Sequence, residues 1–116
     1  MLRHVALVSV EPHESLVRYL EDVGFVVRAV RTPLGAPREG TLVWRADRES
    51  DDRTVVDTMR VWLGAKARLR AIVVTERPVR LRHATEDSRG RVLVLAAPVF
   101  GWQLVDALRD ETFLPS

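Results

Sequence analysis

Five short, mostly apolar runs rich in valine and leucine punctuate this chain, and they constrain its fold more than any other feature. They lie at residues 4–10, 25–30, 41–46, 69–75 and 91–96. A nearly continuous apolar run of this length is typical of a strand buried on both faces of a parallel sheet. We therefore expect five strands in one sheet whose two faces are both covered.

Helical periodicity separates most of these runs. A helix that stops at Gly24 is predicted by apolar residues on one face, namely Leu16, Val17, Leu20 and Val23. A second helix that stops at Gly64 is predicted in the same way by Val55, Val56, Met59, Trp62 and Leu63. Residues 100–110 are predicted to form a C-terminal helix, whereas residues 77–87 support only a short helix.

The connection between the second and third runs is irregular. Residues 31–40 carry two prolines and two glycines without apolar periodicity, so we expect a loop or a single helical turn. A parallel crossover usually needs about a dozen residues or more. Two arrangements therefore stay open: a minimal crossover, or a wide antiparallel hairpin.

Alternating strands and helices predict a single α/β domain over residues 1–116, a flavodoxin-like three-layer sandwich. Its five-stranded sheet should be mostly parallel, with the second helix shortened or missing. A hydrophobic content of 47% and a charged content of 29% are ordinary for globular proteins. Since the chain has no cysteine, disulfides and thiolate chemistry are excluded.

The charge pattern and motifs favour no cofactor or enzymatic chemistry. The net charge is only +2, and the chain has no Gly-rich phosphate loop. His4, His13 and His83 lack the spacing of metal ligands. Ser9, Glu11 and His13 cluster near one strand end but without a nucleophile-elbow motif. We expect a protein that is not an enzyme and binds no cofactor or metal.

No segment predicts a membrane span or a secretion signal. The longest uncharged run, residues 92–105, is shorter than the ~20 residues that cross a bilayer. The N-terminus also lacks the apolar core of a signal peptide. A cytoplasmic protein with no membrane partner is expected.

Ligands of parallel α/β sheets bind beyond the carboxyl ends of the strands. The residues at these positions follow four of the five runs: Ser9, Val10 and Glu11; Arg45, Ala46 and Asp47; Thr75 and Glu76; Ala97 and Pro98. In this layout the chain resembles, over essentially its whole length, a receiver domain of bacterial two-component response regulators. The agreements are Glu11-Pro12, Thr75, and Pro98-Val99-Phe100 before the last helix.

The departures from that family concern phosphotransfer. The family holds Mg²⁺ through an acidic pair where this chain has Ser9 and Val10, and it uses a lysine where this chain has Ala97. The phospho-acceptor position falls on Arg45 or Ala46, and Asp47 reaches it only if the strand register slips. The resemblance thus implies a degenerate phosphorylation pocket made of Ser9, Val10, Glu11, Arg45, Ala46, Asp47, Thr75 and Ala97.

Two positions of Arg45 stay open. Its side chain either enters the vacated pocket and pairs with Glu11 or Asp47, or it extends into solvent at the strand end.

The resemblance implies a non-phosphorylatable pseudo-receiver that acts in signal transduction or transcription regulation through protein contact, including self-association. The alternative is a regulatory domain that binds a small molecule in the strand-end pocket.

Arginines and aromatic residues near the C-terminus predict an interaction surface. Trp44 and Trp62 fit core positions, whereas the surface candidates are Arg80, Arg82, Arg89, Arg91, Phe100 and Trp102. In receivers the face formed by the fourth helix, fifth strand and fifth helix commonly binds partners. Aromatic residues are not interleaved with these arginines, so a protein partner is favoured, with nucleic acid bound only through a neighbouring domain.

Overall fold

The computed structural model describes residues 4–9, 14–37, 39–46, 51–64, 69–84 and 91–109. The elements within these ranges, in chain order, are β1 (His4–Val8), α1 (Glu14–Val23), β2 (Val26–Val30), the 3₁₀ turn η1 (Pro33–Gly35), β3 (Thr41–Arg45), α2 (Asp52–Leu63), β4 (Arg70–Thr75), α3 (Pro78–Ala84), β5 (Val92–Ala96) and α4 (Gly101–Arg109). Each predicted strand and helix is present, and most boundaries differ by one or two residues. The segment after β4 forms the short helix α3.

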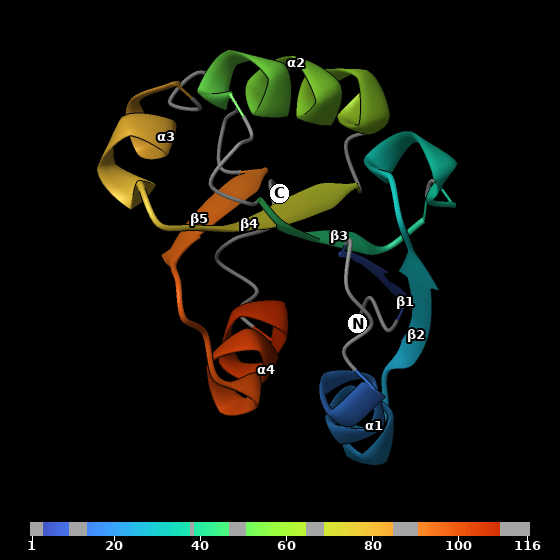
Figure 1. Cartoon of the computed structure of the whole chain (residues 1–116). Helices are drawn as coiled ribbons and strands as arrows, with labels where there is room; N and C mark the ends of the chain where they lie inside the picture. The colour runs from blue at the N-terminus through green and yellow to red at the C-terminus, as the bar shows by residue number, and fades with distance from the viewer. Residues whose placement is uncertain are drawn as a thin grey trace.

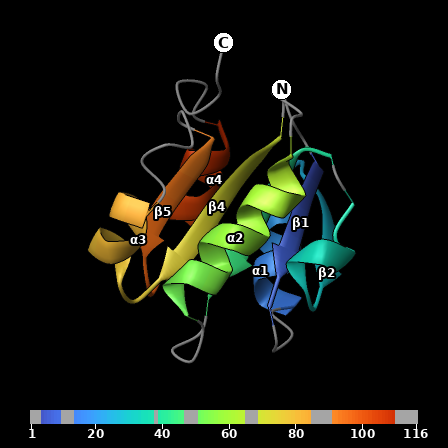
Figure 2. The same ribbon diagram turned by 90° about the horizontal axis from the view of Figure 1, so that it is seen from above.

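All five strands are parallel, in the order β2-β1-β3-β4-β5. Helices α2 and α3 cover one face of the sheet, and α1 and α4 cover the other (Figure 1). Seen from above, α2 lies over the sheet roughly along the direction of the strands, with α3 beside it (Figure 2). This confirms the predicted α/β fold with a flavodoxin-like arrangement.

The hairpin alternative for the second and third strands is wrong. Strand β1 lies between β2 and β3 and pairs with both of them in parallel. The connection must therefore cross over β1, and it does so with only the turn η1 in place of a helix. The second helix is shortened, as predicted.

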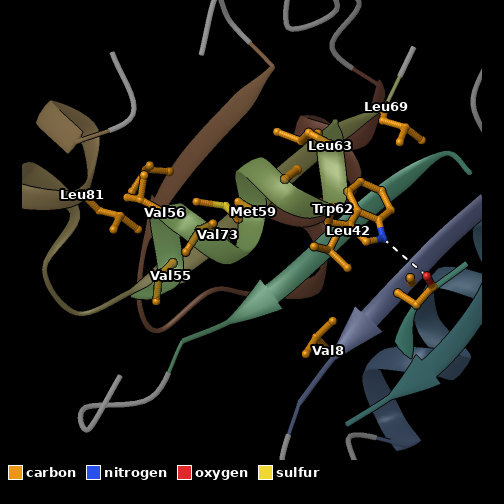
Figure 3. Close-up of a cluster of buried hydrophobic side chains, with 14 residues drawn as sticks. Val8, Leu42, Val55, Val56, Met59, Trp62, Leu63, Leu69, Val73 and Leu81 are labelled. Atoms are coloured by element: carbon orange, nitrogen blue, oxygen red, sulfur yellow. Dashed lines mark hydrogen bonds between the residues drawn. The ribbon is translucent and has the colours of Figure 1, made fainter. Parts of the chain in front are cut away.

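Trp62 contacts the short connection between β2 and β3. Its side chain comes from the last turn of α2 and is only 1% exposed. The indole Nε1 donates a hydrogen bond of 3.4 Å to the carbonyl oxygen of Ala36, just after η1 (Figure 3). One large ring thus packs the short crossover onto the core, as expected for a core tryptophan. Trp44 is half-buried and packs against the same cluster.

Alternation along the strands builds two separate cores. On β3 and β4, Leu42, Ala71 and Val73 face α2, whereas Val43 and Ile72 face α1 and α4. Because successive strand side chains point to opposite faces, each strand contributes to both cores. Burial of both faces of the strands therefore explains the nearly continuous apolar runs of the sequence.

Gly40 permits the close approach of β1 and the start of β3. Its φ is +70°, and a Cβ atom there would lie 2.1 Å from the carbonyl oxygen of His4. Only glycine fits this turn without moving backbone atoms.

Among the described residues, no helix is both long and apolar enough to span a membrane.

Candidate functional site

The carboxyl ends of the strands meet at one edge of the sheet because all strands are parallel. Ser9, Arg45, Thr75 and Ala97 therefore lie along this edge, as the sequence predicted. Ala46 follows Arg45 there and packs against the core beneath α2. Three other members of the predicted pocket, Val10, Glu11 and Asp47, lie outside the described residues.

The strand-end residues do not all face the same side. Arg45 is in register with Val74, and both side chains line a groove on the α1/α4 face. Thr75 comes one residue after Val74, so its side chain points to the α2/α3 face. The structure thus separates Arg45 from Thr75 by the thickness of the sheet.

Thr75 has a local structural role. Its side chain is 4% exposed, and Oγ1 accepts a hydrogen bond of 3.1 Å from the backbone N–H of Arg77. This contact satisfies a donor in the turn that leads into α3. The backbone carbonyl of Thr75 also accepts a bond of 2.8 Å from the N–H of Ala97. A threonine at this position is therefore explained by the start of α3.

The side chain of Arg45 lies in a groove between α1 and α4 at this edge. The groove has a volume of about 480 Å³. Its lining comes from the start of α1, the ends of β3 and β4, and the start of α4: Ser15, Leu16, Tyr19, Arg45, Val74, Val99, Phe100, Gly101, Trp102 and Leu104. Arg45 is half-buried there, and its two predicted partners, Glu11 and Asp47, lie outside the described residues.

Three aromatic side chains at the groove remain exposed to solvent. The exposed fractions are 41% for Tyr19, 63% for Phe100 and 57% for Trp102. The ring of Tyr19 lies directly against Gly101, because a Cβ atom at Gly101 would be 2.8 Å from Cδ1 of the ring. A glycine at the first position of α4 therefore lets the Tyr19 ring line the groove.

The predicted interaction surface is divided by the fold. Phe100 and Trp102 lie at the groove, with Tyr19 and Arg45. Arg91 instead precedes β5 at the opposite edge of the sheet, and Arg80 lies on α3 across the sheet. The aromatic residues and the described arginines thus form separate surfaces. Arg89 lies outside the described residues.

Two arginines of the predicted interaction surface, Arg82 and Arg91, bind backbone carbonyls. Arg91 donates hydrogen bonds of 3.1–3.2 Å to the carbonyls of Leu63, Gly64 and Leu69. Arg82 donates one of 3.3 Å to the carbonyl of Val94. Arg91 thus binds carbonyls at the end of α2 and just before β4, whereas Arg82 binds a carbonyl in the middle of β5.

Asp52 neutralises two further arginines. Its carboxylate lies 3.4 Å from Arg77 and 3.3 Å from Arg80, and its side chain is only 17% exposed. The contacts join the start of α2 to the start of α3. The positive charge of these two arginines is therefore partly compensated on this face.

Sequence reasoning missed Tyr19 and Gly101 as groove residues. Tyr19 lies beside the apolar stripe of α1, and its position in the sequence does not indicate that α4 packs next to it. The two helices become neighbours only because the crossovers place both on the same face of the sheet.

In the described part of the chain, no three His, Asp or Glu side chains cluster as metal ligands would. No protein-family model and no curated protein matches this chain in sequence.

Proposed function

We propose that this chain is a receiver-like regulatory domain that performs no phosphotransfer and binds another protein. Its setting would be signal transduction or transcription regulation in the cytoplasm. The observation that carries this proposal is the groove at the strand ends, with Tyr19, Phe100 and Trp102 exposed along it. The sheet order is compatible with a receiver, although fold alone assigns no function.

The strand-end chemistry supports the loss of phosphotransfer. A phospho-acceptor must be a carboxylate next to bound Mg²⁺, and β3 ends in Arg45. A cation at this position would repel the metal. Ser9 and Ala97 likewise offer neither the carboxylate nor the ammonium group that the reaction uses in receivers.

Protein recognition is supported by the type of residue that the groove exposes. Aromatic side chains dominate the binding energy of many protein interfaces, and tryptophan is among the most enriched. Large apolar side chains that gather around one groove, rather than lie singly, mark an interaction site. Trp102 and Phe100 therefore serve as the expected anchors.

Selection of binding peptides from a random phage-displayed library tests this proposal. Peptides selected by the wild-type protein should bind Trp102→Ala at least tenfold more weakly. Val61→Ala is the matched control, because Val61 is 66% exposed on α2, on the other side of the sheet. Failure to select peptides, or equal binding to Trp102→Ala, would contradict recognition through this groove.

Self-association through the same groove is a related outcome. Analytical ultracentrifugation of the wild type and of Trp102→Ala separates it from binding of a different protein. A dimer that dissociates in the variant identifies a second copy of the chain as the partner.

Incubation with Mg²⁺ and acetyl phosphate or beryllofluoride tests the proposed loss of phosphotransfer. No covalent adduct by intact mass and no Mg²⁺-dependent spectral change are expected.

Small-molecule binding is the second candidate function. A groove of about 480 Å³ falls in the ~300–1,000 Å³ range of ligand sites, which supports it. A thermal-shift screen of small carboxylates and aromatic metabolites distinguishes the two. Ligand-dependent stabilisation without Mg²⁺, together with no peptide binding, would favour this candidate.

A further inference from the structure

The charge of the groove indicates what its occupant carries. Among the described residues that line it, Arg45 is the one with a charged side chain. Helices α1 and α4 both begin at this edge, so their N-terminal ends place partial positive charge near the groove, and the exposed Glu14 in the first turn of α1 offsets part of it. The hydroxyl of Ser15 adds a hydrogen-bond donor in the first turn of α1. The electrostatic environment therefore favours an anionic group next to Arg45.

The walls of the groove favour an apolar group beside that anion. Leu16, Val74 and Leu104 form part of its lining, and the three aromatic rings extend it. Because Val74 and Leu104 are each only 2% exposed, a flat or branched apolar side chain would bury surface mainly against Leu16 and the three rings. Arg45 is half-buried at the end of β3, close to these walls, so the anionic and apolar groups would be adjacent in one occupant.

The exposure of the aromatic rings favours a protein segment over a free small molecule. Small-molecule sites usually enclose 70–90% or more of the ligand surface. Phe100 and Trp102, at 63% and 57% exposed, leave the groove open on one side. A segment that continues across the surface would cover these rings and exclude water around the buried contact.

We infer that the groove binds a peptide segment in which a glutamate or aspartate side chain is adjacent to an aromatic or large aliphatic side chain. This rests on the proposed function. The carboxylate would pair with the guanidinium of Arg45, whose five N–H donors allow a new partner beside its existing contacts. The apolar side chain would pack against Trp102 and Phe100.

The sequences and affinities of the selected peptides test this inference. We expect them to share an acidic residue next to an aromatic or aliphatic one. In calorimetric titrations, replacing that acidic residue with its amide should weaken binding about tenfold, as should Arg45→Gln. In Arg45→Gln the acidic and amide peptides should bind equally, whereas Arg45→Lys should retain part of the preference for the acid. Thermal melts of both variants check that they fold.

The outcomes separate this inference from the proposal beneath it. Peptides that require Trp102 but lack an acidic residue, or bind acid and amide forms equally, overturn the inference and leave protein recognition intact. Peptides that are indifferent to Trp102 overturn both. A final arm uses N-acetyl-phenylalanine and its uncharged amide as small probes. If the free carboxylate binds as tightly as the peptides, the occupant is a small molecule and the inference is wrong. The replacement of the peptide's acidic residue with its amide is measured on the wild-type protein, so the test stays valid even if Arg45→Gln does not fold.

Discussion

The guanidinium of Arg70, buried at the start of β4, donates a hydrogen bond to the backbone carbonyl of Leu108 in the last turn of α4. The same side chain donates through Nε to Oγ1 of Thr41, at 2.7 Å. Arg70 is 1% exposed and Thr41 is fully buried. A cation next to the C-terminal end of a helix is favoured by the helix dipole. The bond between Arg70 and Leu108 therefore holds the C-terminal helix against the sheet.

Arg70→Met should destabilise the fold strongly. It leaves the hydroxyl of Thr41 and the carbonyl of Leu108 buried without this donor, which should lower the free energy of unfolding by about 2–4 kcal/mol. Thr41→Val removes one of the two acceptors. The double variant should lose less than the sum of the single losses, and urea unfolding of the four proteins measures this coupling.

The matched control for this prediction is Arg53→Met. Arg53 lies on α2 with its side chain 88% exposed, beside Asp57 at 4.0 Å. Its replacement should change stability by no more than about 0.5 kcal/mol. Additive losses for Arg70 and Thr41 would show that the bond between their side chains carries no stability, and equal effects of Arg70→Met and the control would show the same for all the buried contacts of Arg70.

Arg91→Met should also destabilise, to a smaller degree. Arg91 binds the carbonyls of Leu63 and Gly64, which are left without intrahelical partners at the end of α2. Because Arg91 is only half-buried and water can replace part of these bonds, we expect a loss of about 1–2 kcal/mol. Thermal or urea unfolding beside Arg18→Met, an exposed arginine on α1, provides the comparison. An equal effect of the two substitutions would refute this structural role.

Trp62→Phe should show how far the short crossover depends on one side chain. The substitution removes the N–H that binds Ala36 and leaves a small cavity, for an expected loss of about 1–3 kcal/mol. Val61→Ala changes the neighbouring, exposed residue of α2 and should be almost neutral. Hydrogen exchange of the η1 segment should accelerate in Trp62→Phe but not in the control. Unchanged exchange there would mean that Trp62 does not hold the crossover.

The three tryptophans should differ in their accessibility to a collisional quencher. Trp102 is 57% exposed, Trp62 is 1% exposed, and Trp44 is half-buried. Iodide should therefore quench mainly Trp102, and Trp102→Phe should remove most of the quenchable fluorescence with little change in stability. The same measurement in the presence of a selected peptide reports on occupancy of the groove. If quenching persists in Trp102→Phe, Trp102 is not the exposed anchor.

Much of the fold could be predicted because local patterns specify it. The apolar runs fix the strands, since both faces of each inner strand are buried, and the spacing of Val55 to Leu63 fixes α2. The shortened second helix follows from the prolines and glycines of residues 31–40. Whether that segment crossed over or turned back was not decided locally. The pairing of β1 with both β2 and β3 decided it.

The candidate site was only partly predictable. The rule that parallel strands end at one edge placed Arg45 and Thr75 together, but the alternation of strand side chains sent them to opposite faces. Arg70 is charged, yet its position on β4 buries it against α4. One-dimensional charge counts cannot distinguish these environments, because Thr41 and Leu108, which bind Arg70, lie 29 and 38 residues away from it in the sequence.

The sequence by itself determined which segments become strands and helices, because apolar periodicity and turn residues act over a few neighbours. It also determined that Ser9 and Ala97, which carry neither a carboxylate nor an ammonium group, follow the first and fifth strands. Only the tertiary structure decided that Tyr19, Arg45 and Trp102 share one groove. These residues come from α1, β3 and α4, and it is the packing of two helices on one face of the sheet that brings them together.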